Sequence, residues 1–369
     1  MKQFNLTILF TVLMNMVGAK AFAYDVAVEN EDGKTIYYNY INNSTELEVT
    51  YSYSYRYSGD IKIPETVTIL NKTRKVTSID KDAFYDCSGL TSVTIPSSVT
   101  SIGNSAFFCC SGLTSITIPS SVTSIGSYAF EGCSGLKKVV VKDLAAWYGI
   151  SFGSYYSNPL SCAKHLYSDE DTEITDLVIP EDVTSINSYT FSGCSGLTSV
   201  TIPSSVASID QDAFYGCSGL TSVTIPSSVA SIDQGAFYGC SGLTSVTIPA
   251  SVTSIGSYAF DYCNNLADFV SLIEEPFGVD YIVSDLVYNN GTLYVPEGTI
   301  EKYKATDGWK QFLWIEEGVP MSIKQPNANG ADAKETQRYT IGGDIINNPQ
   351  RGINIVKMSD GTVKKVIVK

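Results

Sequence analysis

The residues best suited to covalent chemistry are a cysteine and the chain's single histidine, which stand three positions apart. Cys162 and His165 lie close to Asp169, in a stretch that interrupts an otherwise regular pattern. A thiol beside a proton acceptor can act as a nucleophile, so this pair is compatible with a hydrolase. The spacing matches no known signature of a cysteine enzyme, and we expect His165 to be a surface or packing residue.

Paired acids offer a second kind of chemistry, because carboxylates two residues apart can bind Ca²⁺. Such pairs are Asp80 with Asp82 and Asp210 with Asp212. Other copies of the pattern carry glycine, serine or tyrosine there, so we expect solvated turn residues. No paired Cys-x-x-Cys and no glycine-rich phosphate loop is present. The sequence therefore predicts no catalytic residue, no metal and no cofactor, and we do not expect an enzyme.

The elements that position these side chains belong to a unit that recurs every 23 residues, which predicts a solenoid. In the copy from Leu220 to Gly242, Val223 and Ile225 alternate with polar residues, which predicts a short strand that Pro226 ends. An Ala-Phe step then precedes Gly-Cys-Ser-Gly, where we expect a helical or 3₁₀ turn. The repeated phenylalanines are Phe84, Phe107, Phe130, Phe191, Phe214, Phe237 and Phe260.

Stacked units would bury these phenylalanines in one continuous column, since a single unit is too small to form a core. Seven of the nine cysteines also occupy one repeated place: Cys87, Cys110, Cys133, Cys194, Cys217, Cys240 and Cys263. Their side chains would run parallel, whereas a disulfide needs converging Cβ vectors. We therefore expect reduced, buried cysteines that act as small hydrophobic residues.

The repeated run Leu-Thr-Ser-Val-Thr-Ile-Pro-Ser-Ser-Val, followed by Ala-Phe and Cys-Ser-Gly-Leu, resembles the BspA-type leucine-rich-repeat proteins of Bacteroidetes. The resemblance covers about residues 61 to 297. It implies a β-rich leucine-rich-repeat solenoid with short strands and short helical turns, capped at both ends. It also implies a secreted or surface-displayed protein, and in several relatives adhesion to host proteins or to other bacteria.

The N-terminus is typical of a secretory signal peptide. Lys2 precedes an apolar run from Leu6 to Val17, and Ala21-Phe-Ala23 predicts cleavage near Ala23. No later stretch is long and apolar enough to predict a membrane span. The chain carries a formal net charge of −14, which disfavours nucleic acid and anionic lipid as partners. A basic partner or a neutral glycan stays open.

Composition and the phase of the repeat divide the chain into several parts. Residues 24–60 contain Tyr51-Ser-Tyr-Ser-Tyr-Arg-Tyr57, which predicts either a β cap over the first coil or an exposed tyrosine stripe for carbohydrate or peptide. The predicted parts are a signal peptide (1–23), an N-terminal β cap (24–60), the solenoid (61–297) with an insertion at about 142–177, a C-terminal cap (298–316), a linker (317–338) and a small β tail (339–369).

The tail resembles the C-terminal sorting domain of type IX secretion. The matching residues are Gly343, Gly352-Ile-Asn-Ile-Val356 and Lys365-Val-Ile-Val-Lys369. The pattern departs at Gly342 and Asp344, where an Asp and an Arg are usual.

The aromatic residues that follow the buried phenylalanine are the predicted contact residues: Tyr85, Phe108, Tyr215 and Tyr238. Rigid aromatic surface favours recognition, although these rings could also cover the turn hydrophobically. We expect an adhesin or scaffold at the cell surface, associated with the outer membrane, that contacts a host extracellular protein, a bacterial surface protein or a glycan. One alternative is glycan or peptide capture for nutrient uptake, centred on residues 142–177. The other is a hydrolase that uses the insertion.

Overall fold

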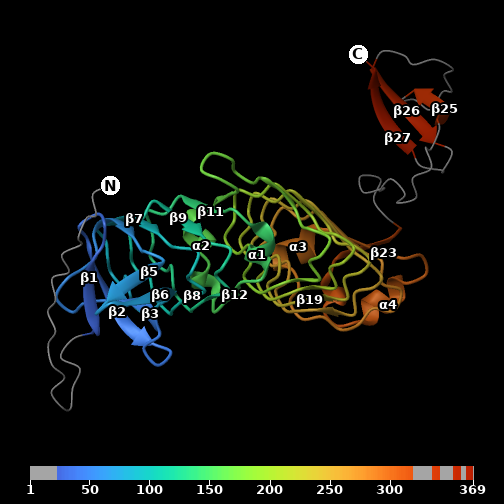
Figure 1. The fold of residues 1–369 in the computed structure, drawn as a ribbon. Coiled ribbons are helices and arrows are strands. Elements are labelled where there is room, and N and C mark those ends of the chain that lie inside the picture. Colours follow the sequence, from blue (N-terminus) through green and yellow to red (C-terminus); the bar gives the residue numbers. More distant parts are fainter. Residues whose placement is uncertain (1–22, 319–334, 341–351, 359–362, 369) are drawn as a thin grey trace. The chain divides into compact units, whose positions relative to one another are not determined.

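The computed structural model describes residues 23–318, 335–340, 352–358 and 363–368. They form two compact units, one ending at Gly318 and the other beginning at Val319. The predicted signal peptide lies outside the described residues, apart from Ala23. The first unit is a solenoid whose coils follow one another in sequence order (Figure 1).

Most coils contribute two parallel strands, one to each of two series that run along the solenoid. The first series is β4 (Gly59–Lys62), β7 (Leu90–Thr94), β9 (Ser115–Ile118), β11 (Lys138–Val141), β13 (Leu166–Tyr167), β14 (Asp176–Val178), β16 (Ser199–Thr201), β18 (Ser222–Thr224), β20 (Ser245–Ile248), β22 (Asp268–Ser271), β23 (Thr292–Val295) and β24 (Trp314–Glu317). The second series is β6 (Lys72–Ile79), β8 (Ser101–Ile102), β10 (Ser124–Ile125), β12 (Ser151–Phe152), β15 (Ser185–Ile186), β17 (Ser208–Ile209), β19 (Ser231–Ile232) and β21 (Ser254–Ile255).

Parallel pairing in register places like residues over like. Val200 pairs with Val223. The phenylalanines are completely buried and form two stacks. Phe84, Phe107 and Phe130 have ring centroids 4.9 and 5.0 Å apart with interplanar angles of 3° and 10°. The second stack holds Phe191, Phe214, Phe237 and Phe260. The predicted repeat fold, rich in strands with a few short helices, is confirmed.

The Ala-Phe segments differ from the expected helical or 3₁₀ turn, because they form consecutive turns without a helix. Residues on either side of the phenylalanine adopt the left-handed conformation, for example Asp212 at φ 54° and Gly216 at φ 69°. A helix cannot continue through such residues. The freed N–H group of Phe214 instead donates to the carbonyl of Ala236 in the next coil, at 2.8 Å.

All nine cysteines are free, and the seven repeated ones are buried, as predicted. They also do more than fill space. The Sγ of Cys110 donates to the carbonyl of Phe84 at 3.0 Å, and Cys240 donates likewise to Phe214 at 3.2 Å. Burial raises the pKa of the Cys194 thiol to about 12. Five of the repeated thiols donate to the carbonyl of the phenylalanine one coil back, namely those of Cys110, Cys133, Cys217, Cys240 and Cys263.

The insertion is an enlarged coil rather than an appendage. It contains α1 (Leu144–Tyr148), η1 (Tyr155–Ser157) and α2 (Leu160–Ala163), and Asp143 caps α1 as predicted. Strand β12 pairs in register with β10, and β13 pairs with β11. Both series break at this coil, the first between β13 and β14 and the second between β12 and β15. The first series also breaks between β7 and β9 and between β18 and β20, where the second series continues.

The enlarged coil lacks a phenylalanine for the stack. Phe130 donates its N–H to Tyr156, as Phe107 does to Ala129, so buried Ser157 stands in the phenylalanine place. Trp147 and Tyr148 of α1 fill the space, and Tyr148 meets Phe191 edge-on at 5.5 Å. The Trp147 indole N–H donates to the carbonyl of Thr190 at 3.1 Å.

Irregular elements cover both ends of the first unit. At the N-terminal end, β1 (Val26–Glu29), β2 (Thr35–Ile41) and β3 (Glu46–Thr50) are antiparallel, β3 runs parallel to β6, and β5 (Thr66–Ile69) forms a hairpin with β6. At the other end lie α3 (Asp285–Asn290), α4 (Ile300–Ala305) and η2 (Trp309–Gln311), with Trp309 fully buried. Thr299 precedes α4, but its hydroxyl donates to the carbonyl of Pro296 instead of capping the helix.

The second unit contains a three-stranded antiparallel sheet. Its strands are β25 (Glu335–Thr340), β26 (Gly352–Met358) and β27 (Val363–Val368), in that order. Strand β25 begins inside the range 317–338 that we expected to be a linker.

Trp147 tests whether the insertion is part of the core. Trp147→Ala removes a large buried ring and leaves the Thr190 carbonyl without its indole donor, so we expect a loss of about 3–5 kcal/mol in unfolding free energy. Urea denaturation followed by circular dichroism measures it. Trp314→Ala is the control, because that ring is 59% exposed and should change stability by less than about 0.5 kcal/mol. Equal, small effects of both substitutions would contradict a structural role for α1.

Candidate functional site

The four predicted contact residues lie in two stacked pairs. Tyr85 stacks on Phe108 with centroids 5.0 Å apart, and Tyr215 stacks on Tyr238 at 4.8 Å with an interplanar angle of 3°. Tyr85 is exposed and the other three are half-buried. The coils between the pairs carry Glu131 and Ser192 in this repeat position, so these four residues alone do not form a continuous row.

The enlarged coil extends one of these pairs. Tyr155 meets Tyr215 edge-on at 5.0 Å, and Tyr156 meets Tyr155 at 4.9 Å. Tyr128 adds to one end at 6.3 Å from Tyr156, and Tyr262 adds to the other at 5.0 Å from Tyr238. The tyrosine row, as we name it, is Tyr128, Tyr156, Tyr155, Tyr215, Tyr238 and Tyr262. Sequence reasoning missed Tyr155 and Tyr156 because the insertion shifts them out of the 23-residue phase.

The tyrosine row is accessible to a partner. Tyr128, Tyr156 and Tyr262 are 49%, 42% and 55% exposed. Parallel rings such as Tyr215 and Tyr238 cover each other's faces, so their accessible parts are ring edges. Burial raises the pKa of Tyr155 and of Tyr238 to about 12, so both phenols remain protonated at neutral pH. The row therefore offers apolar edges and neutral hydroxyl groups.

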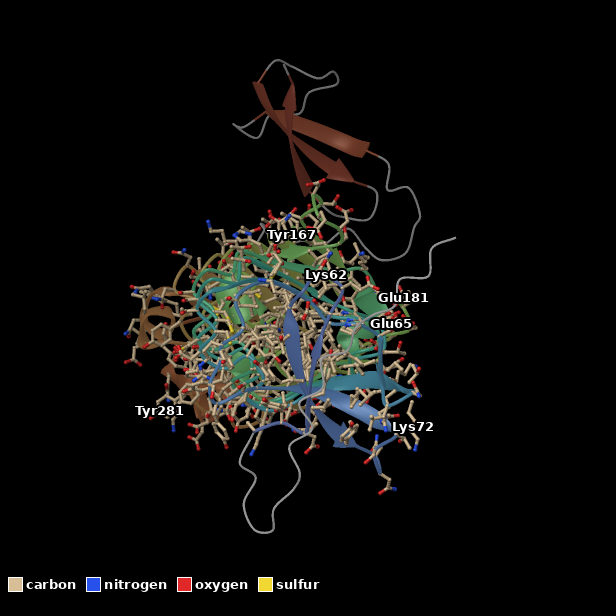
Figure 2. All side chains as sticks on the ribbon, turned by 60° about the vertical axis from the view of Figure 1, so that its left-hand side comes forward. Lys62, Glu65, Lys72, Tyr167, Glu181 and Tyr281 are labelled. Atoms are coloured by element: carbon tan, nitrogen blue, oxygen red, sulfur yellow. The ribbon has the colours of Figure 1, made fainter. Side chains whose placement is uncertain are left out.

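Several exposed tyrosines stand where the backbone disfavours them. The exposed Tyr128 and Tyr258 have φ values of 62° and 61°, and the half-buried Tyr189 has φ 64°. Gly235 fills the same repeat position with φ 63°. A bulky side chain costs about 1–2 kcal/mol in the left-handed region, whereas glycine adopts it freely. Tyr258 in turn lies 6.3 Å from Tyr281, which projects at the surface and is 55% exposed (Figure 2).

Acidic residues flank the tyrosines. Burial raises the carboxyl pKa of Asp212 and of Asp261 above the usual value. Of the predicted acid pairs, Asp80 accepts hydrogen bonds from Thr50 and Asn39, and Asp210 accepts one from Ser185. Within the described residues, no group of three or more His, Cys, Asp or Glu side chains could hold a metal ion.

Cys162 and His165 of the insertion interact with different partners. His165 Nδ1 lies 2.6 Å from Glu173 Oε1. The Sγ of Cys162 donates to the carbonyl of Phe130 at 3.2 Å, and Asp169 accepts N–H groups within its own loop. The nucleophile and base of the hydrolase hypothesis thus have other partners. Glu173 lies eight residues after His165, and no spacing pattern in the sequence predicts that the two side chains pair.

Asp212 provides a pH-dependent prediction. Its raised pKa means that the folded chain binds a proton at this carboxyl more readily than the unfolded chain, so its ionisation opposes folding above that pKa. Asp212→Asn should therefore raise Tm at pH 7 by about 1–2 °C, with the gain shrinking as the pH falls through the raised pKa towards 3.8.

Differential scanning calorimetry between pH 3 and pH 7 measures the effect. Asp182→Asn, at an exposed carboxylate, controls for the removal of one negative charge. A gain at Asp212 that matched the control at every pH would contradict the assignment.

No helix among the described residues has the length and apolarity needed to cross a membrane. The chain is similar to a leucine-rich-repeat protein from Bacteroides ovatus, at 22% identity and a TM-score of 0.43, covering 78% of this chain and 88% of that chain. It is also similar to a leucine-rich cell-surface protein from Faecalibacterium prausnitzii, at 22% identity and a TM-score of 0.39, covering 80% and 96%.

A third solved structure, a leucine-rich-repeat protein from T. pallidum, is 25% identical with a TM-score of 0.36, covering 63% of this chain and 87% of that chain. Comparison with curated proteins gives no match. The model of the BspA-type leucine-rich-repeat region matches six copies, over residues 49–148 and 164–280. Because this match spans more than half of the chain, the protein belongs to the BspA-type leucine-rich-repeat family.

Proposed function

We propose that this protein is exported and acts at the cell surface as an adhesin or scaffold, binding a host extracellular protein, a bacterial surface protein or a glycan. The tyrosine row is the observation that carries this proposal. It is a continuous series of aromatic rings and hydroxyl groups along the solenoid, and aromatic anchors of this kind favour macromolecular recognition.

Backbone strain supports a contact role for Tyr128 in the tyrosine row and for Tyr258 outside it. Glycine would fit the left-handed position of Tyr128 or Tyr258 without strain, as it does at Gly235. Strained conformations persist where function or packing requires the side chain. Tyr128 and Tyr258 are 49% and 43% exposed, so packing accounts for only part of their surface.

Glycan or peptide capture for nutrient uptake is the second candidate. It gains support from Tyr155 and Tyr156, because the insertion at about 142–177 supplies two members of the tyrosine row. Deleting the insertion would also remove Trp147 from the core, so point substitutions separate binding from folding more cleanly.

The second unit is the part that we associate with export. Its three antiparallel strands hold the predicted sorting residues Gly352–Val356 in β26 and Lys365–Val368 in β27. We propose that residues 339–369 direct the chain to type IX secretion, after removal of the signal peptide near Ala23.

The tyrosine row is tested by the double substitution Tyr215→Ser and Tyr238→Ser, and separately by Tyr262→Ser. The partner is first found by probing arrays of extracellular matrix proteins and glycans with the mature chain. For the strongest binder, we expect each variant to weaken binding by about tenfold or more, the effect of losing one aromatic anchor.

Tyr294→Ser is the matched control, because this half-buried tyrosine lies on β23, outside the row. Circular dichroism confirms that each variant is folded. Undiminished binding by both row variants would refute a contact role for the row.

Removal of residues 339–369 tests the export proposal. We expect the truncated chain to lose surface display and to accumulate inside the producing cell, as followed by protease accessibility on intact cells. Truncation leaves the first unit, which ends at Gly318, complete. Unchanged surface display would eliminate the sorting role of the tail.

A further inference from the structure

A depression of about 430 Å³ lies on the N-terminal cap, away from the tyrosine row. Its walls include Lys34, Tyr37, Tyr55, Arg56, Tyr57 and Ser58. The volume is within the range of small-molecule sites. Two cations and three tyrosines thus share one concave surface on a chain whose formal net charge is −14.

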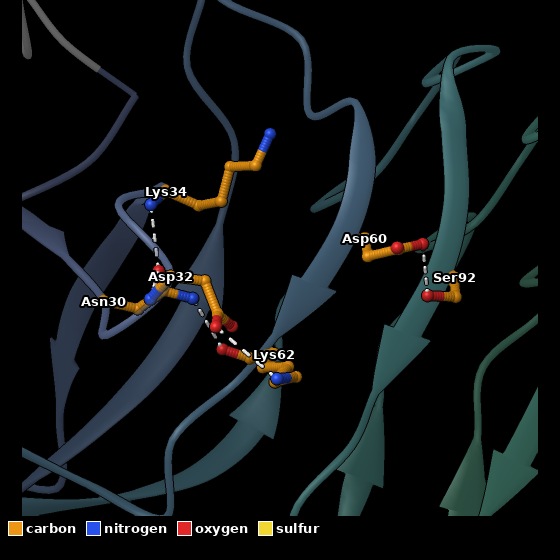
Figure 3. Close-up of polar contacts among 6 residues, drawn as sticks. All are labelled: Asn30, Asp32, Lys34, Asp60, Lys62 and Ser92. Carbon is orange, nitrogen blue, oxygen red and sulfur yellow. Dashed lines mark hydrogen bonds and ion pairs between the residues drawn. The ribbon is translucent and has the colours of Figure 1, made fainter.

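Neither cation is engaged by an acid. Among the described residues, Lys34 and Arg56 form no ion pair, and the nearby acids have other partners (Figure 3). Asp32 pairs with Lys62 at 3.4 Å. Asp60 accepts from Ser92 and Thr91 at 2.7 Å each, and these bonds, with a smaller effect of Lys34 and Lys62, lower its pKa.

The ammonium of Lys34 lies close to Gly59, where a Cβ atom would stand 3.6 Å from Nζ. Gly59 has φ 69°, a conformation that favours glycine. Because Gly59 has no side chain, the space beside the Lys34 ammonium stays open. Lys34 thus lines the depression with an ammonium that forms no ion pair among the described residues.

The aromatic residues of the depression include one exposed ring, Tyr55, and one buried ring at its floor, Tyr57. Tyr55 is 69% exposed and has no ring partner within the described residues. Tyr57 is buried: its hydroxyl donates to the carbonyl of Thr50 at 2.8 Å and accepts the N–H of Tyr37 at 3.0 Å. Its ring packs on Phe84 at 4.6 Å, which ties the floor to the first phenylalanine of the solenoid.

We propose that this depression binds a sugar residue that carries a carboxylate. The apolar face of a pyranose ring packs on an aromatic ring such as Tyr55. The carboxylate would meet Arg56, whose guanidinium matches it with two parallel hydrogen bonds, and Lys34 as a point charge. Ser58 adds a hydroxyl group for the ring hydroxyls. Exposed acids farther than about 8 Å are screened at physiological salt. The nearby Asp32 and Asp60 already have partners, so the two cations, which form no ion pair in the described part of the chain, favour a negative charge on the ligand.

This inference is independent of the tyrosine row, since the two sites share no residue. The test uses the mature full-length chain and isothermal titration calorimetry with three acidic probes: tetragalacturonate, a hyaluronan tetrasaccharide and 3′-sialyllactose. The neutral counterparts are methyl-esterified tetragalacturonate, chitotetraose and lactose. We expect at least one acidic probe to bind about tenfold or more tightly than its neutral counterpart.

Lys34→Gln and Arg56→Gln should each weaken that binding by about fivefold or more, and Tyr55→Ser by several-fold. Lys72→Gln is the charge-matched control, because Lys72 is exposed at the start of β6 and does not line the depression (Figure 2). It should leave the affinity unchanged. The tyrosine row variant Tyr215→Ser with Tyr238→Ser should also retain the saccharide, which separates failure of this site from failure of the proposed function.

Three results would overturn the proposal. The first is that no acidic probe binds better than its neutral counterpart. The second is that Lys72→Gln weakens binding as much as Lys34→Gln and Arg56→Gln, which would indicate diffuse attraction. The third is that only a peptide with a free C-terminal carboxylate, and not its amide or any acidic saccharide, is bound through Arg56.

Discussion

The structure depends on the stacking of identical side chains at one repeat spacing. A single coil cannot bury its phenylalanine, but neighbours in register place each ring on the next at about 5 Å and shield it completely. The same register supplies main-chain partners, as between Phe214 and Ala236, and thiol donors, as between Cys240 and Phe214. Each coil therefore depends on its neighbours for burial. For this reason both ends need caps, and the enlarged coil must fill the place of its missing phenylalanine.

The surface inherits its spacing from this core. Because Phe214 and Phe237 stack, the residues that follow them, Tyr215 and Tyr238, must stack as well. A row of contact residues thus arises wherever the repeat carries tyrosine in that position. The enlarged coil keeps the row continuous although its own core position holds Ser157, since Trp147 and Tyr148 restore the missing volume. Core packing and surface pattern are set by one geometric requirement.

The periodic features were predictable from the sequence. The strand ending before Pro226, the buried Phe214 and the free Cys217 all follow from a 23-residue register, in which one copy predicts the next. The turns around phenylalanine were harder to predict, because their left-handed residues vary among Asp, Ser, Tyr and Gly and give no single signal. The roles of the repeated Ser and Thr residues were also hard to predict. Some of their hydroxyl groups donate to carbonyls one coil back, as Thr221 does to Thr198.

The candidate sites were only partly predictable, because tertiary packing brings some of their residues together. Tyr155 and Tyr156 belong to a segment outside the repeat phase, so their neighbours are fixed by tertiary packing rather than by spacing. The depression on the cap combines Lys34, which immediately precedes β2, with Tyr55 and Arg56 from a loop about twenty residues later. The alternating tyrosines of residues 51–57 indicated an aromatic surface, but the two free cations beside it emerge only from the folded arrangement.

The enlarged coil also divides the solenoid mechanically. Both strand series stop there, and the junction is bridged by side-chain bonds such as Trp147 to Thr190 and Asn158 to Tyr189, and by isolated main-chain bonds such as Gly196 to Lys164. Elsewhere at least one of the two ladders joins successive coils. A tensile force along the axis would thus meet its weakest junction at this coil, and a chain held at both ends under shear flow would part into two folded halves before either half unravelled.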